Sequence, residues 1–68
     1  MKIFAQRIRE LRLERELEQQ AVAEALKTTR TNVSNWETDR CEPDMKTIVA
    51  LAAFFNTSAD YLLGITDV

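Results

Sequence analysis

With 68 residues the chain can form one small domain, and 9 Lys and Arg against 11 Asp and Glu give a net charge of −2, which disfavours nucleic-acid binding through overall charge alone. The absence of histidine and a single cysteine, Cys41, exclude an internal disulfide and leave no zinc or transition-metal ligand set, so we predict no metal and no cofactor. No segment approaches the ~20 apolar residues of a membrane span, and a single glycine, Gly64, excludes a glycine-rich phosphate loop.

The apolar pattern predicts five helices, no strand and a single domain over residues 1–68. The first helix runs from Phe4 to Arg15. Its core stripe is Phe4, Ile8 and Leu11. The second helix begins at Gln19, and small alanines on its inward face let another helix approach closely. This inward face consists of Val22, Ala23 and Leu26.

The third helix, residues 29–37, begins at Thr29, a good N-cap residue, and carries Val33 and Trp36 on its inward stripe. At about 100° per residue, the outward face then centres near Thr31. The remainder of that face is polar and free of acids: Arg30, Asn32, Ser34 and Asn35. Solvated helix faces usually carry Glu and Lys, which are better helix formers, so this composition favours hydrogen bonding to a partner. Two short, tightly hinged helices of this kind are how a protein reads DNA.

The fourth helix follows the stop-and-start signal Glu42-Pro43-Asp44, in which Asp44 can cap the new helix. We expect Asn56 to end it in a left-handed conformation. The residues expected to be buried are Met45, Ile48, Leu51, Ala52 and Phe55.

A last short helix is predicted after Ser58, which can cap it. Leu62 and Leu63 pack inward, and Gly64 closes the helix because glycine adopts the left-handed conformation without strain. Residues 65–68 form a short tail that we expect to fray.

Together these features resemble the Cro and phage-repressor (XRE) family of helix-turn-helix regulators, with the motif at about residues 18–37. The resemblance covers roughly Phe4 to Gly64 and depends on the order and spacing of its residues. These are Ile8, Leu11, Arg12, Leu17, Gln19, Ala23, Trp36-Glu37, Glu42-Pro43 and Asp60-Tyr61-Leu62-Leu63-Gly64. It implies an all-α, λ-repressor-like five-helix bundle that binds double-stranded DNA. It also implies a cytoplasmic transcriptional regulator, a repressor, of bacterial or phage origin.

The resemblance assigns two kinds of DNA contact. Side chains of the third helix reach base edges in the major groove, where Arg can grip guanine, Asn can grip adenine and a Thr methyl can meet thymine. The residues in these positions are Arg30, Thr31, Ser34 and Asn35. Other positions contact phosphates, which orients the domain without selecting a sequence. The residues in those positions are Gln19, Thr29, Asn32 and Arg40.

Arg12 and Glu37 match a pair that, in similar domains, joins the first helix to the end of the recognition helix. The pair would fix the recognition helix against the body of the domain and leave part of the Arg12 guanidinium facing a phosphate. An ion pair without a role in DNA binding is an equal alternative.

Several positions depart from the family pattern. Lys27 stands where the turn usually has glycine, so it must adopt a left-handed conformation at roughly 1–2 kcal/mol or reshape the turn. Thr28 replaces an aliphatic residue, and Thr38-Asp39 replaces Asn-Gly. Glu16 and Glu18 replace glycine and Thr or Ser, which weakens the cap of the second helix and brings acid close to the phosphates.

The acidic surface and the unusual turn leave a second function open, in which the same fold binds protein as an antitoxin-like or modulator subunit. Catalysis is not expected. Ser34, Ser58 and Cys41 have no histidine base, and the carboxylates are spread along the helices as ordinary surface charge.

Apolar residues near the C-terminus exceed the needs of a five-helix core. A helix that buries Phe55 turns Phe54 by about 100°, toward an edge or the solvent. We predict dimer contacts at Phe54, Ile65 and Val68, with Val49 adding to the patch. A homodimer that forms on DNA would set two recognition helices ~34 Å apart and require a pseudo-palindromic operator. In the alternative, Phe54 folds over the edge of the core.

Overall fold

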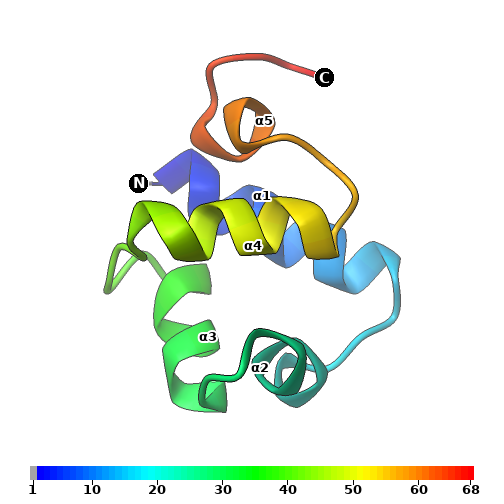
Figure 1. Cartoon of the computed structure of the whole chain (residues 1–68), viewed down its shortest axis with the longest axis vertical. Helices are drawn as coiled ribbons and strands as arrows, with labels where there is room; N and C mark the ends of the chain where they lie inside the picture. Colours follow the sequence, from blue (N-terminus) through cyan, green and yellow to red (C-terminus); the bar gives the residue numbers. More distant parts are fainter. Residues whose placement is uncertain (1) are drawn as a thin grey trace.

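The computed structural model describes residues 2–68, which fold into five helices without a strand (Figure 1). In chain order the helices are α1 (Lys2–Glu14), α2 (Gln19–Leu26), α3 (Arg30–Glu37), α4 (Met45–Phe54) and α5 (Ala59–Leu63). The all-α class expected from the apolar pattern is confirmed. Within the described residues, no helix has both the length and the apolar character needed to cross a membrane.

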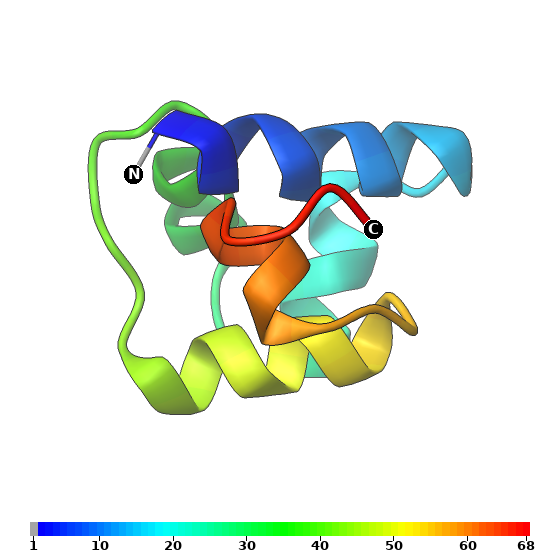
Figure 2. The same ribbon diagram turned by 90° about the horizontal axis from the view of Figure 1, so that it is seen from above.

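Helices α1, α4 and α5 form one part of the domain, here called the frame, and α2 and α3 form a pair that packs against it. α1 and α4 lie on opposite sides of the molecule, and α5 packs between them near one end (Figure 2). α2 and α3 form the other end, where α3 packs against α1 and α2, and α2 also contacts α4 (Figure 1). A turn at residues 27–29 joins α2 to α3. The α2–α3 pair is therefore held by its inner side and exposes its outer side.

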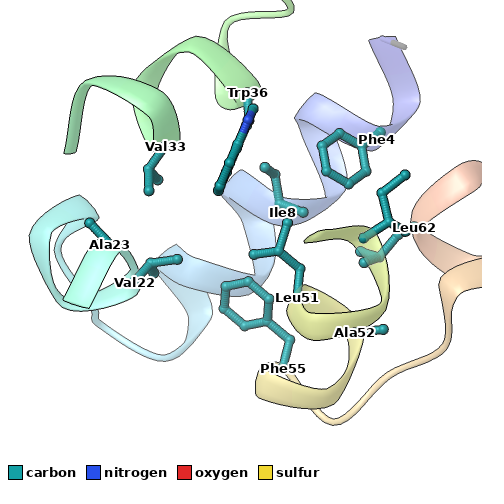
Figure 3. Close-up of a cluster of buried hydrophobic side chains, with 11 residues drawn as sticks. Phe4, Ile8, Val22, Ala23, Val33, Trp36, Leu51, Ala52, Phe55 and Leu62 are labelled. Atoms are coloured by element: carbon teal, nitrogen blue, oxygen red, sulfur yellow. The ribbon is translucent and has the colours of Figure 1, made fainter. Parts of the chain in front are cut away.

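The core lies where the helices meet (Figure 3). Trp36 of α3 points toward Ile8 of α1, and Phe55 lies beside Leu51 of α4. Within residues 2–68 the buried cluster is Phe4, Ile8, Val22, Ala23, Val33, Trp36, Ile48, Leu51, Ala52, Phe55 and Leu62. The inward stripes expected for the helices are confirmed apart from Met45. Trp36 and Phe55 are core residues, as their helical spacing indicated.

Met45 was expected in the core, and this is wrong, because its side chain is 61% exposed. Asp44 caps α4, which makes Met45 the first helical residue. At the very start of the helix its side chain lies beyond the end of the cluster that Ile48 and Leu51 enter. Correct helical spacing therefore did not bury this residue.

Three helices begin with the expected side-chain caps. Thr29 Oγ1 accepts a hydrogen bond from the Asn32 amide at 3.2 Å, and Ser58 Oγ accepts one from the Tyr61 amide at 3.0 Å. Asp44 Oδ1 accepts one from the Thr47 amide at 2.9 Å. Hydrogen bonding to Thr47 holds the pKa of Asp44 below its ordinary value. These confirmed caps set the start of α3, α4 and α5.

Each helix is followed by a residue with positive φ. These residues are Glu16, Lys27, Asp39, Asn56 and Gly64. At the turn between α2 and α3, Lys27 has φ 58° and ψ 45°, and the Thr28 amide donates to the Ala23 carbonyl at 2.9 Å. This is a Schellman ending. The left-handed conformation expected at Lys27 is confirmed.

Replacing Lys27 by glycine is expected to leave the free energy of unfolding unchanged or raise it by up to about 1.5 kcal/mol. Glycine removes the left-handed strain, roughly 1–2 kcal/mol, but gains freedom in the unfolded chain, about 0.4–1 kcal/mol. Urea denaturation measures the difference. Gly64→Ala, which adds a side chain at another left-handed position, is the control. It should lower the free energy of unfolding, because φ is +80° and a Cβ would lie 3.1 Å from Ile3 Cγ2. A loss above about 1 kcal/mol in Lys27→Gly would contradict this account.

Arg7 of α1 ties the C-terminal segment to the frame. Its guanidinium donates hydrogen bonds to the Tyr61 carbonyl and, at 2.7 Å, to the Thr66 carbonyl. It also lies 4.2 Å from the centre of the Tyr61 ring. Val68, by contrast, is 92% exposed. The segment is thus held as far as Thr66, and fraying of its end stays a prediction.

Candidate nucleic-acid interface

The outward face of α3 is polar and lies around a surface hollow. This hollow, here called the reading hollow, is lined by Arg30, Thr31, Ser34, Asn35 and Arg40. Thr38 Oγ1 donates to the main-chain carbonyl of Ser34 at 2.8 Å. This bond does not involve the Ser34 hydroxyl, which can still bind another partner. On the opposite side of the helix, Val33 and Trp36 are buried and anchor α3. A firmly held helix therefore presents hydrogen-bonding side chains to the outside.

The start of α3 is braced by its own polar residues. Asn32 Nδ2 donates to Thr28 Oγ1 at 2.8 Å, while Thr29 Oγ1 accepts from the Asn32 amide. One N–H of the Asn32 side-chain amide is thereby used within the turn, which leaves its other N–H and its oxygen for a partner. The Thr29 hydroxyl still has a proton to donate to an anion. Of these two residues expected at phosphates, Thr29 is the better placed donor.

Glu37, the last residue of α3, is buried and joins three helices. It accepts hydrogen bonds from Arg12 Nε at 2.7 Å, from Arg12 Nη2 at 3.0 Å and from Gln19 Nε2 at 3.1 Å. Arg12 belongs to α1, and Gln19 is the first residue of α2. These hydrogen bonds include the Arg12–Glu37 ion pair that the resemblance implied. Gln19 is a further member of the same network. The network fixes both motif helices against the frame.

The Arg12 guanidinium is largely occupied by this network. Its Nη1 also donates to the Leu17 carbonyl at 2.7 Å, and the side chain is only 11% exposed. Hydrogen bonding to Glu37 raises the pKa of Arg12, partly opposed by burial. Arg12 is therefore mainly a structural cation, with few donors left for a phosphate.

A second hollow lies at the start of α2, and we call it the helix-start hollow. Its lining residues are Arg12, Glu18, Gln19, Gln20 and Arg30. Arg30 lines both hollows, so they adjoin one another. Gln19 was expected here. Glu18 was expected to weaken the cap of α2 and to bring acid close to the phosphates, whereas Gln20 was assigned no role from the sequence.

The charge distribution near α3 differs from the net charge. Residues 25–36 contain Lys27 and Arg30 and no carboxylate. Arg40 follows on the rim of the reading hollow, and the charge of Glu37 is paired with Arg12. The segment around α3 thus carries positive charge although the chain as a whole is negative.

This arrangement, with a short outward-facing helix packed across a tight turn on the preceding helix, is that of a helix-turn-helix. A family model described as helix-turn-helix matches residues 8–62. The chain belongs to this helix-turn-helix family. The XRE-type resemblance read from the sequence is thereby confirmed.

Curated helix-turn-helix relatives match nearly the whole chain. The transcriptional regulator ImmR of Bacillus subtilis (strain 168) is 38% identical over 65 residues, which cover 96% of this chain and 51% of ImmR. The uncharacterized transcriptional regulator YobD of the same strain is 31% identical over 65 residues, which cover 96% of this chain and 58% of YobD. The chain thus spans about half the length of these relatives.

A solved helix-turn-helix protein has the same fold. The P22 c2 repressor, in complex with a synthetic operator, superimposes with a TM-score of 0.84 at 27% identity, covering 91% of this chain and 94% of that one. A hypothetical transcription factor from Neisseria, NHTF, also gives a TM-score of 0.84 at 27% identity, covering 91% of this chain and 71% of that one. The λ-repressor-like fold expected from the sequence is confirmed.

Proposed function

We propose that the chain is a sequence-specific DNA-binding domain of a transcriptional repressor and that α3 enters the major groove. The observation that carries this proposal is the outward face of α3, which is rich in hydrogen-bonding groups, lacks acids and is rigidly anchored from behind. The names of the relatives, which are transcriptional regulators, and the operator complex of the P22 c2 repressor support it.

Within this proposal, the four residues of α3 that line the reading hollow contact base edges. Arg30 can make a bidentate contact with guanine, Asn35 can do the same with adenine, and the Thr31 methyl can meet a thymine methyl. Ser34 serves as a fourth, adaptable donor or acceptor. These side chains project from one short helix, so they read neighbouring base pairs.

The residues around the reading hollow contact the DNA backbone. Arg40 contributes a full charge from the rim, and Thr29 can donate its hydroxyl proton. Gln19 lies at the start of α2 and Asn32 on the first turn of α3. Arg12 adds positive charge to the wall of the helix-start hollow. These contacts set the orientation of α3 in the groove.

A binding selection tests the proposal. The purified chain is incubated with a pool of random duplexes, and bound DNA is amplified and sequenced over several rounds. Enrichment of one pseudo-palindromic sequence is the expected result. Failure to enrich any sequence, with no shift of random duplex at low salt, would point instead to the protein-binding alternative.

We place the domain in the cytoplasm, with no catalytic activity of its own.

We further propose that two copies pair on the operator through exposed apolar side chains of α4 and the C-terminal tail, here called the C-terminal apolar patch: Val49, Phe54, Ile65 and Val68. Val49 is 56% exposed and Ile65 is 71% exposed. Phe54 is 37% exposed and packs edge-on against Phe55, with ring centroids 5.0 Å apart. Phe54 thus covers the core edge and still presents apolar surface. Such a patch suits a self-complementary contact.

Phe54→Lys is expected to abolish cooperative binding to a full operator while leaving half-site affinity nearly unchanged. The lysine places a charge in the apolar contact but lies away from the reading hollow. Sedimentation with and without operator reports the pairing. Leu13→Lys, at a 49% exposed position on α1, controls for the added positive charge. Undiminished cooperativity in Phe54→Lys would move the dimer contact elsewhere.

A further inference from the structure

Glu18 occupies the cap position of α2 without acting as a cap. Its backbone has the extended conformation of an N-cap residue, with φ −86° and ψ 159°, but its side chain accepts no capping hydrogen bond. Three other helices in the described residues have Thr29, Asp44 and Ser58 in this role, each accepting from a backbone amide. The exposed Glu18 carboxylate therefore does not stabilise the start of α2 by a capping hydrogen bond.

The carboxylate lies instead in the helix-start hollow, beside the amide end of α2. A helix N-terminus carries a partial positive charge that favours anions. The other lining residues are the cations Arg12 and Arg30 and two glutamines, so Glu18 is the one acid in the hollow. The Arg12 charge is already paired with Glu37, so Arg30 and Glu18 carry the remaining, opposite charges of the hollow.

The helix-start hollow adjoins the reading hollow through Arg30. If α3 reads DNA as proposed above, on which this inference rests, the phosphates flanking the bases it reads pass close to this hollow. A carboxylate there repels every such phosphate equally, because the DNA backbone is the same at all sequences. The repulsion grows as water is excluded and weakens as salt screens it.

We propose that Glu18 is an affinity-limiting residue, which lowers affinity for the DNA backbone by the same factor at every sequence. The domain then remains on DNA only where the base contacts of α3 and the pairing of two copies compensate for the loss. Random DNA, which offers no base contacts to offset this loss, is thereby released readily.

The test compares Glu18→Gln with Glu10→Gln in titrations of operator and random duplex. Glutamine keeps the size of the side chain and removes the charge without supplying a Ser or Thr cap. Glu10 is exposed on α1, and two residues, or about 200°, separate it from Arg12, so it faces away from the helix-start hollow. The control thus makes the same change in net charge on another face.

Glu18→Gln is expected to bind both duplexes more tightly by one common factor, about threefold or more at low salt, as for two charges ~6 Å apart in water. The factor should shrink toward one as salt is raised, and Glu10→Gln should show less than half of it. An equal gain in both variants, or a gain on the operator alone, overturns the role of Glu18. Absence of DNA binding by wild type and Glu18→Gln alike overturns the proposed function itself.

Discussion

Replacing Glu37 by alanine is expected to lower the free energy of unfolding by about 3–5 kcal/mol, as is typical when one member of a buried ion pair is removed. The Arg12 side chain is only 11% exposed, so its charge would remain buried without a carboxylate. Gln19 would lose its acceptor as well. At about 0.05–0.15 kcal/mol per residue, a domain of this size has roughly 3–10 kcal/mol of total stability, so a loss of this size removes a large part of it.

Urea denaturation followed by circular dichroism measures this loss. Glu37→Gln is the matched control, since glutamine keeps the shape and one acceptor oxygen and should cost less than alanine. Asp67→Ala removes the weaker partner of a second ion pair, 3.6 Å from Arg7 Nη2, whose carboxylate is fully exposed, and should change stability little. A loss below about 1 kcal/mol in Glu37→Ala would mean that the network contributes little to the free energy of unfolding.

The fold followed from local features of the sequence. Thr29, Asp44 and Ser58 are short polar residues placed just before apolar stripes, and each became a cap because the backbone amides of a first turn need acceptors. A left-handed Lys27 was one of the two outcomes that the sequence left open, and a reshaped turn was the other. The predicted burial of Met45 was wrong, because helical spacing does not reveal where the neighbouring elements end.

The site was less visible than the fold. The reading face could be derived because Val33 and Trp36 fix which side of α3 is outside. The hydrogen bond from Gln19 to Glu37 could not, because it joins helices whose relative position depends on the whole core. The same holds for Arg7, which reaches the Thr66 carbonyl across 59 residues of sequence. Long-range polar contacts leave no periodic signal in a single sequence.

Asn35→Ala and Thr31→Ala are expected to change which bases are preferred, each by about 1–3 kcal/mol at one operator position. Asn35 is half-buried at the reading hollow and Thr31 is exposed there, and neither belongs to the core cluster. Removing either side chain should therefore leave the fold intact while deleting a base contact. A second binding selection with each variant identifies the position whose preference is lost.

The contrast with Arg40→Ala makes this expectation decisive. A residue that neutralises a phosphate supports all sequences alike, so its loss should weaken operator and random duplex by the same factor. It should also lower the slope of log affinity against log salt by about one. Asn35→Ala should leave that slope unchanged, because it removes no charge. If Asn35→Ala and Thr31→Ala also weakened operator and random duplex equally, α3 would hold the DNA backbone without reading its bases.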